Sequence, residues 1–216
     1  MDTRIKLSKL SERHYKTPLL RLATFALVAA SSLSANVLTG VTATTDMGAA
    51  SGTVISQIVD GSGLSSYDPS ATHDNGSPSN AWVGDLSTGM ITFDLGGSFE
   101  LDGMAVWNFN ALSAFGVQDV TVSSSLDGIS FTPISGAPST FSIGSNLSSE
   151  SAETFQFSAT AAFVRFDIAS NYGGANTALS EVMFTGAPSA VPEPQTYALF
   201  LTGLAAFVYK RRSHKV

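Results

Sequence analysis

Residues 91–97 read Ile-Thr-Phe-Asp-Leu-Gly-Gly, and this stretch decides the expected fold. Apolar and polar side chains alternate over its first five residues, a period of two that is typical of a half-buried β-strand. The two glycines then interrupt the pattern. Similar short runs, separated by loops rich in Gly, Ser and Asn, lie at residues 37–43, 104–109, 117–123, 130–132, 155–157, 164–168 and 182–184. No convincing amphipathic helix and no internal repeat accompanies them, so the pattern predicts an all-β fold, an antiparallel sandwich.

The N-terminal segment differs in composition from the middle of the chain. Residues 1–21 contain six of the 11 Lys and Arg, and an uncharged apolar run follows at 22–33. A basic region, a short apolar run and the small-x-small site Ser32-Leu33-Ser34 indicate a secretory signal peptide over residues 1–34. The alternative is a true membrane helix, but the run is shorter than the ~20 residues that a span needs.

The C-terminal segment, residues 191–216, has three consecutive parts. A Pro-rich string comes first, an uncharged apolar stretch covers 197–209, and a basic cluster follows at 210–212. The string is Val191-Pro192-Glu193-Pro194. This order resembles a PEP-CTERM sorting signal, the tail that bacterial exosortases cut. An ordinary terminal membrane anchor is the alternative, since the basic cluster would stay cytoplasmic in either case.

The PEP-CTERM resemblance implies a destination and a processing partner. The protein would be exported to the cell envelope or extracellular matrix of a Gram-negative-type bacterium. Its C-terminal hydrophobic sorting helix would insert transiently into the membrane, and an exosortase-type processing enzyme would then cut the tail.

Between its two ends the chain is strongly acidic. Ten of the 11 bases lie in the terminal segments, as do Asp2, Glu12 and Glu193, so Arg165 is the one base among 14 acids. Such a surface repels phosphate backbones, which excludes nucleic-acid binding. We expect Arg165 to pair with a neighbouring carboxylate, although it could also clamp an acidic sugar. The chain has no Cys, so an exported domain must rely on its core, and on any bound metal, for stability.

Four segments of the body, residues 35–190, resemble in order the discoidin-type (coagulation factor C-type, galactose-binding-like) domains. The segments are ITFDLG with LDGMAVWN within 91–108, the hairpin at 123–131, FVRFDI at 163–168 and LSEVMF at 179–184. The resemblance implies an eight-stranded jelly-roll sandwich. It also implies a non-catalytic module that binds sugars, lipids or proteins through loops at one end, and in many members a structural calcium.

The implied calcium site draws on the loop at 74–82 and on the last of these segments. Asp74 and Ser79 stand where the family's D-G-N-x-x-T-x-W loop places its ligands, and Glu181 matches the closing acid. Carboxylate, carbonyl and hydroxyl oxygens are the ligands that calcium prefers. Asp60 is a rival source of the aspartate, and a plain solvated turn is the alternative to any metal site.

Candidate ligand-binding residues come from predicted loop ends, because a sugar site needs an aromatic face and a few planar polar groups. They are His73, Asn110, Asn171 and Tyr172. We expect Trp107 in the core and Trp82 as a plug at the end of the sandwich. The resemblances to the discoidin-type domains and to the PEP-CTERM signal imply a carbohydrate-binding module that engages exopolysaccharide. A structural or adhesive matrix protein with protein partners is the alternative.

An enzymatic function has little support in the sequence. His73 is the only His of the body, and no nucleophile elbow, metalloprotease motif or phosphate loop occurs. A pair of carboxylates, as in glycoside hydrolysis, is the remaining enzymatic alternative. We therefore expect the protein not to be an enzyme.

Overall fold

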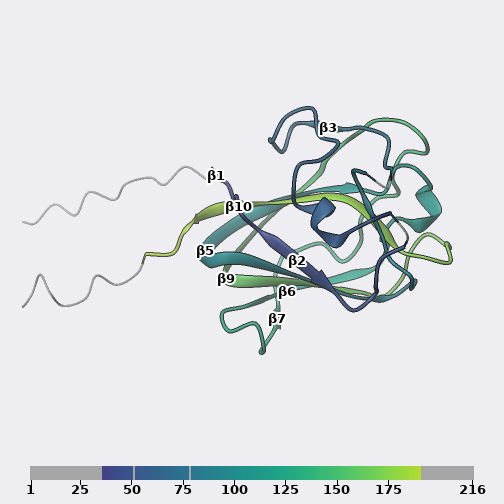
Figure 1. Ribbon diagram of the computed structural model, residues 1–216. Helices are drawn as coiled ribbons and strands as arrows, with labels where there is room; N and C mark the ends of the chain where they lie inside the picture. The colour runs from purple at the N-terminus through teal and green to yellow at the C-terminus, as the bar shows by residue number, and fades with distance from the viewer. Residues whose placement is uncertain (1–35, 51, 78, 191–216) are drawn as a thin grey trace, which may run out of the picture. The chain divides into compact units, whose positions relative to one another are not determined.

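The computed structural model describes residues 36–50, 52–77 and 79–190, and this part of the chain is all-β (Figure 1). Every strand pair in it is antiparallel, as the period of two predicted. Its helical segments are two 3-10 turns, η1 (Ile55–Ile58) and η2 (Ser113–Phe115). The strands are β1 (Asn36–Val37), β2 (Thr42–Thr45), β3 (Thr72–His73), β4 (Trp82–Val83), β5 (Gly89–Asn108), β6 (Val120–Ser125), β7 (Thr132–Pro133), β8 (Glu150–Ser151), β9 (Glu153–Ile168) and β10 (Ala178–Pro188).

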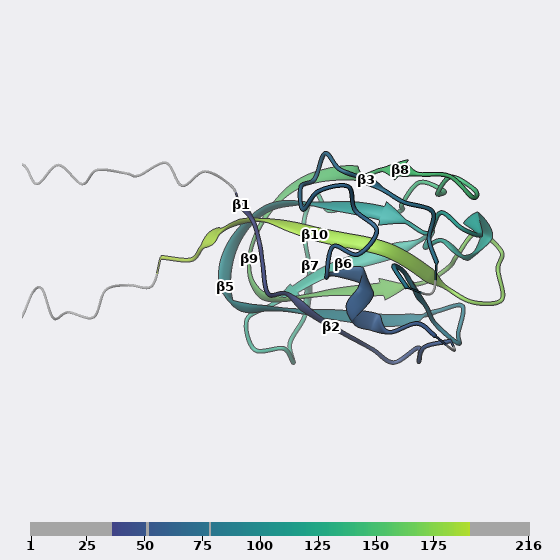
Figure 2. The same cartoon turned by 45° about the horizontal axis from the view of Figure 1, so that its top comes forward.

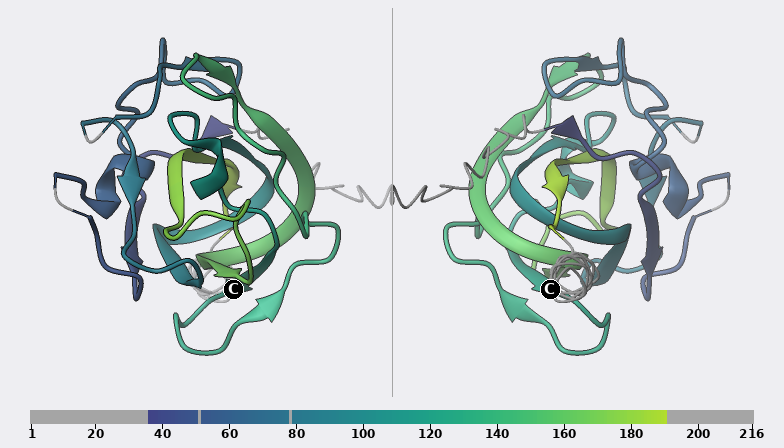
Figure 3. Two further views of the ribbon diagram at one scale, coloured as in Figure 1. Left: turned by 90° about the vertical axis from the view of Figure 1, so that its right-hand side faces the viewer. Right: turned by 90° about the vertical axis from the view of Figure 1, so that its left-hand side faces the viewer.

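Two long strands, β5 and β9, run through the whole domain and wrap around its core (Figures 2 and 3). The first half of β5 pairs with β2 and its second half with β10, while β9 accompanies it on both halves. The sequence predicted two separate strands with a stop at Gly96-Gly97, and this prediction is wrong. Gly96 adopts φ +77°, and the pairing with β9 is irregular between Asp94 and Phe99, so the strand bends there and continues.

A second irregularity in β5 changes which side chains face the core. Odd-numbered residues such as Phe93 and Leu101 are buried in the main core before the shift between Leu101 and Gly103. After it, the even-numbered Met104 and Val106 take that place. Between the pairs Leu101–Gly186 and Gly103–Thr185, β5 has one residue more than β10, and an extra residue turns the following side chains over. Trp107 then faces outward into a smaller apolar cluster with Ala71 and Met183, which the segment leading into β3 covers.

The N-terminal run that we predicted as one strand, 37–43, is divided in two. β1 pairs with β10, whereas β2 pairs with β5. Gly40 lies between them with φ +76°, a left-handed conformation that favours glycine and lets the chain cross from one neighbour to the other.

Aromatic side chains fill the main core. The ring of Phe93 packs edge-on against Phe166 at 4.9 Å and against Phe184 at 5.1 Å. Trp107 is fully buried, as predicted, and Trp82 is fully buried as well; each indole N–H donates to a backbone carbonyl.

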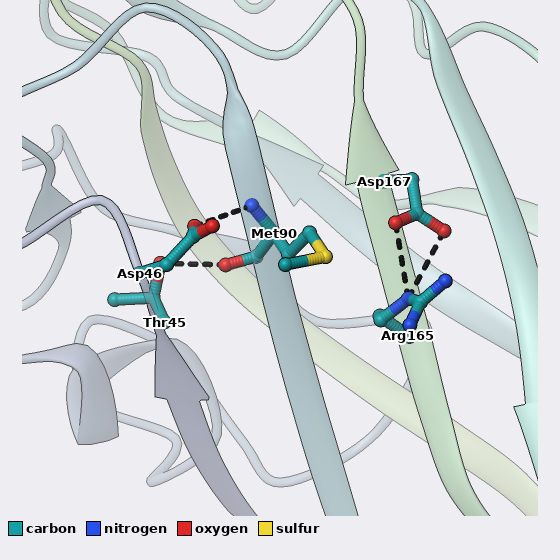
Figure 4. A network of polar contacts seen from close by, with 5 residues as sticks. All are labelled: Thr45, Asp46, Met90, Arg165 and Asp167. Atoms are coloured by element: carbon teal, nitrogen blue, oxygen red, sulfur yellow. Dashed lines mark hydrogen bonds and ion pairs between the residues drawn. The ribbon is translucent and has the colours of Figure 1, made fainter. Parts of the chain in front are cut away.

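Figure 4 shows polar contacts on the outer side of the sheet at β2, β5 and β9. Arg165 Nε lies 3.0 Å from Asp167 Oδ1, which confirms the expected ion pair, and the guanidinium stacks over the ring of Phe131 at 4.3 Å. Beside it, Asp46 Oδ1 accepts a hydrogen bond of 2.7 Å from the backbone N–H of Met90. The only base of the body is therefore paired within its own strand, β9, and covers the ring of a residue in the turn before β7.

The two ends of the sandwich differ in what they carry. β1 and the last residues of β10 lie at one end, and the loops at 109–118 and 170–177 lie at the other (Figures 1 and 2). Within the described residues no helix is long and apolar enough to cross a bilayer. The expected signal peptide, the sorting motif Val191-Pro192-Glu193-Pro194 and the apolar stretch at 197–209 lie outside those residues.

Candidate functional site

Asn110 is the centre of the end of the sandwich that carries the loops. Its side chain is fully buried, and its amide nitrogen donates to the carbonyl oxygens of Asp74 (2.8 Å) and Ser148 (2.9 Å). Its amide oxygen accepts from the N–H of Gly76 (2.8 Å) and the hydroxyl of Ser180 (3.1 Å). All hydrogen-bonding groups of this amide are used to join two loops to β10. Asn110 thus supports the loops and has no free group for a ligand.

Asn108, which was not among the predicted ligand-binding residues, likewise supports the neighbouring loops. Its Nδ2 donates to the carbonyls of Val117 and Ser142, each at 2.8 Å. Its Oδ1 accepts from the N–H of Val117 at 2.9 Å. The short spacing Asn-Phe-Asn at the end of a β-strand was the only sequence signal for this pair of amides.

The candidate Asn171 organises its own loop. Its Oδ1 accepts from the N–H of Gly173 at 2.9 Å, and its Nδ2 donates to the carbonyls of Gly174 (3.0 Å) and Asn176 (2.8 Å). This half-buried amide therefore fixes the shape of the loop at 170–177. It presents the next residue, Tyr172, from a rigid frame.

Tyr172 is a predicted ligand-binding residue with an aromatic ring that is partly accessible. Its ring is half-buried, and its hydroxyl donates to the carbonyl of Phe141 at 2.5 Å. Burial raises the pKa of this phenol, and the carboxylates of Glu153 and Asp119 raise it further. The ring is thus anchored between two loops in an acidic neighbourhood, which favours neutral ligands over polyanions.

His73 lies on β3, away from any solvent. It is fully buried, with Nδ1 2.6 Å from the carbonyl oxygen of Asp74 and Nε2 3.1 Å from that of Asn80. β3 pairs with β8, so two loops that the sequence left separate are joined in a small sheet. The contacts of His73 hold the loop at 74–80 and leave no ring nitrogen for a sugar.

Glu181 is a buried acid with very few partners. Both of its carboxylate oxygens lie 3.2 Å from one N–H, that of Gly61. Burial raises its pKa to about 9; the Gly61 N–H opposes this shift and the carboxylate of Asp60 adds to it. The hydroxyl of Ser62 is also buried and has no hydrogen-bond partner. An uncompensated acid beside an unpartnered hydroxyl fits the oxygen donor set of a hard cation such as calcium.

The other two predicted metal ligands lie on a neighbouring piece of chain. Asp74 is exposed and its Oδ1 accepts from the N–H of Asn75, while the exposed Ser79 bonds the hydroxyl of Ser77. The backbone N–H of Asp74 donates to the carbonyl of Gly63, so the two turns are adjacent. The acid that acts on Glu181 is nevertheless Asp60, the rival that the sequence offered. Asp60-Gly61 matches the D-G pair that begins the family's loop, and this match was the sequence signal for Asp60.

Within the described residues, no group of three or more His, Asp or Glu side chains gathers as a metal cluster. A cation at Glu181 would therefore take most of its ligands from hydroxyl and carbonyl oxygens of the turn at 60–63.

Comparison with known proteins identifies the family. Residues 49–182 match the F5/8 type C domain, and residues 190–212 match the PEP-CTERM protein-sorting motif. The chain therefore belongs to the F5/8 type C (discoidin-like) family, with a PEP-CTERM sorting motif behind the domain. A search of curated proteins found no significant match.

The solved structures that it resembles are carbohydrate-binding modules. One is a family 32 module of a Clostridium perfringens family 89 glycoside hydrolase, in complex with GalNAc-β-1,3-galactose: TM-score 0.50, 19% identity, covering 69% of this chain and 99% of that one. Another is a family 32 module of a family 31 glycoside hydrolase from the same organism: TM-score 0.50, 16% identity, 69% and 96% coverage. The match to the longer family 89 hydrolase chain has TM-score 0.49 and 22% identity, and it covers 72% of this chain but only 15% of that one. At these identities the likeness confirms the jelly-roll fold.

Proposed function

We propose that this protein is an exported glycan-binding module that engages exopolysaccharide outside the cell after processing by an exosortase-type enzyme. The observation that carries the proposal is the construction of the end that bears the loops. Buried amides hold its loops in one arrangement in a domain of the carbohydrate-binding type. A surface ordered before it meets its ligand loses little conformational entropy on binding.

The chemistry of that end favours a neutral sugar. Tyr172 offers a ring fixed by its hydrogen bond to Phe141, and a sugar ring packs well on an aromatic face. The acids Asp119 and Glu153 act on the same phenol, so a polyanion would be repelled. The similar family 32 module was solved in complex with GalNAc-β-1,3-galactose, so disaccharides that contain galactose or GalNAc are the first ligands to test.

No catalytic step is part of this proposal. The two family 32 modules that the domain resembles are binding modules that belong to glycoside hydrolases, and the likeness to the longer hydrolase chain covers a small part of it. Binding without turnover is the expected result with every glycan offered.

A glycan array followed by pull-down on purified exopolysaccharide tests the function. We expect retention that changes little between low and high salt, because stacking and hydrogen bonds to hydroxyls are less sensitive to ionic strength than charge attraction. Tyr172→Ala should weaken it, while Ile129→Ala, which removes an exposed apolar side chain from the hairpin between β6 and β7, should not. Retention of no glycan under any condition would favour the structural or adhesive matrix protein.

We also propose a structural calcium at Glu181. The buried acid, its single N–H partner and the unpartnered hydroxyl of Ser62 support it. Glu181, Asp60 and oxygens of the turn at 60–63 would hold the ion, with Asp74 as the competing aspartate. The ion would supply the positive charge that the carboxylate lacks, and would tie β10 to this turn.

A further inference from the structure

The last residues of β10 are tied to the beginning of the second half of β5. The Cα pairing of the two strands continues to Pro188 and Phe99. One residue later, the backbone N–H of Ser189 donates to the carbonyl of Ser98 at 2.9 Å. The folded domain therefore extends to residue 189.

Four side chains close this end of the domain, and we call them the tail clasp. The hydroxyl of Ser189 donates to Glu100 Oε1 at 3.1 Å and lies 3.1 Å from the hydroxyl of Ser98. The other oxygen of Glu100 accepts from the hydroxyl of Thr160 on β9 at 2.9 Å. Ser98, Glu100, Thr160 and Ser189 thus connect three strands next to the tail.

The sorting motif begins almost at once after the tail clasp. The matched motif starts at residue 190, and its Val191 is the second residue after Ser189. Since an extended residue spans at most about 3.6 Å, a link of two residues is no longer than about 7 Å. An enzyme that binds the motif as an extended peptide therefore meets the folded domain on the N-terminal side.

A groove of about 440 Å³ lies next to the tail clasp, lined by residues that include Leu101, Ser158, Pro188 and Ala190. Its walls come from β5, β9 and β10, the same three strands that the clasp joins. The surface that an approaching enzyme would touch is thus the end of these strands.

We propose that the tail clasp limits the access of the sorting enzyme to the motif, and that cleavage requires the end of β10 to separate from β5. This inference rests on the proposed processing by an exosortase-type enzyme. The clasp suits such a role because Ser98 and Glu100 are exposed, so water replaces their hydrogen bonds at small cost when the strand end opens. Pro188 contributes no N–H to the ladder, which weakens the last pair further.

A reversible lock on the tail clasp tests the inference directly. In the full-length chain, Ser98→Cys with Ser189→Cys places two thiols where hydroxyls now lie 3.1 Å apart, and the natural chain has no other Cys. Cleavage is followed by pulse-labelling in the native host and intact mass, with and without reductant. We expect the oxidised variant to be cut about tenfold more slowly or worse, and reduction to restore the rate, as follows when local opening must precede cleavage.

A second variant works in the opposite direction. A flexible Gly/Ser spacer of about ten residues inserted between Ala190 and Val191 adds a reach of about 17 Å. It should accelerate cleavage of the otherwise natural chain, and it should abolish the effect of the disulfide. The wild type is the control, and it should be cut at the same rate with and without reductant.

Three outcomes are decisive. Slow cleavage of the oxidised variant, relieved by reductant and by the spacer, supports the inference. Equal cleavage of oxidised and reduced variants, or a spacer that leaves the rate unchanged or lowers it, overturns the inference while leaving the processing itself established. A wild-type chain that is never cut overturns the proposed processing and the inference together.

Discussion

The two ends of this sandwich are held by the same kind of bond in opposite surroundings. At the loop end, buried amides such as Asn110 bind backbone groups of several loops. At the tail end, exposed hydroxyls and the carboxylate of Glu100 bind one another across strands. Each end has several hydrogen bonds, so their number does not distinguish them.

The difference teaches that burial decides what such bonds do. A buried group that loses its partner finds no water, and leaving it unsatisfied costs about 1–3 kcal/mol. An exposed group exchanges its partner for water, and the net cost is small. We therefore expect a loop end that keeps one shape and a tail end that opens readily.

The largest effect should come from Asn110→Ala. This change leaves the N–H of Gly76 and the hydroxyl of Ser180 without their partner in a buried place, while the carbonyls of Asp74 and Ser148 keep their contacts with His73 and Ser145. The free energy of unfolding should fall by about 3 kcal/mol, since the costs of the two orphaned groups add. Urea unfolding measures it. The exposed Asn146→Ala on the nearby loop should change stability by less than about 0.5 kcal/mol. Equal effects of the two variants would remove the contrast between the ends.

Calcium should stabilise the domain by a comparable amount. An ion that binds only the folded state adds about 2.7 kcal/mol when its free concentration is a hundredfold above its dissociation constant. Glu181→Gln should abolish the gain. Asp60→Asn and Asp74→Asn distinguish the two candidate turns, and we expect the larger loss from Asp60→Asn because Asp60 acts on Glu181. A melting temperature indifferent to calcium and to chelator would refute the site.

The raised pKa of Glu181 determines how the stability of the metal-free domain depends on pH. Folding raises the pKa of Glu181 from the ordinary 4.5 to about 9, because the carboxylate is buried. Between these values the folded state holds a proton that the unfolded state has released, so the free energy of unfolding falls as pH rises, by up to about 1.4 kcal/mol per unit. The Glu181→Gln variant should lack this slope, and calcium should reverse it. Chelated wild type that keeps its stability from pH 5 to 9 would contradict the assignment.

Tyr172 tests whether the rigid loop end is also the binding end. Tyr172→Ala removes the ring and should weaken glycan binding by about tenfold, the equivalent of a stacking contact of roughly 1.4 kcal/mol. Tyr172→Phe keeps the ring but loses the bond to Phe141, so it should bind nearly as well if its loop stays in place. Titration calorimetry with the glycan found on the array gives both constants. If Tyr172→Ala binds the glycan as tightly as the wild type, the binding site lies elsewhere on this end.

The smallest effect belongs to the tail clasp. Ser189→Ala removes two exposed hydroxyl bonds and should lower the free energy of unfolding by less than about 0.5 kcal/mol. Thr185→Val, four residues upstream on β10, removes a less exposed hydroxyl bond to Asp102 and should cost more. Hydrogen exchange of the backbone amide of residue 189 should be fast in both variants. If Ser189→Ala lowers the free energy of unfolding as much as Asn110→Ala does, the two ends are alike.

Much of the fold could be read from the chain because short-range patterns determine it. Observed strands correspond to the alternation at 91–95 and 164–168, to the hairpin at 123–131 and to the segments that resemble the family. In the turn of that hairpin Asp127 accepts hydrogen bonds from the backbone N–H groups of Ile129 and Ser130, and Gly128 has φ +71°. Each of these features depends on residues a few positions apart.

The candidate site was harder to predict because its residues were chosen by type and loop position. His73 and Asn110 have the right chemistry for gripping sugar hydroxyls, yet both are buried and bonded to backbone. Only the packing of β3, β8 and the loop at 145–148 decides that, through contacts between segments more than thirty residues apart. Residue type does not reveal which of several polar side chains becomes the internal support.

By itself, the sequence determined the strand period, the antiparallel all-β class, the acidic body with its one base, and the order of motifs that places this chain in its family. These depend on neighbours along the chain and on composition, which folding does not change. Tertiary structure alone decided that the runs on either side of Gly96-Gly97 form one bent strand and that Glu181 faces Asp60. It also decided that Asn110 supports loops while Ser189 closes an opening end. Burial and partners across the sheet exist only once distant segments pack, and they determine whether a polar side chain holds the fold or meets a ligand.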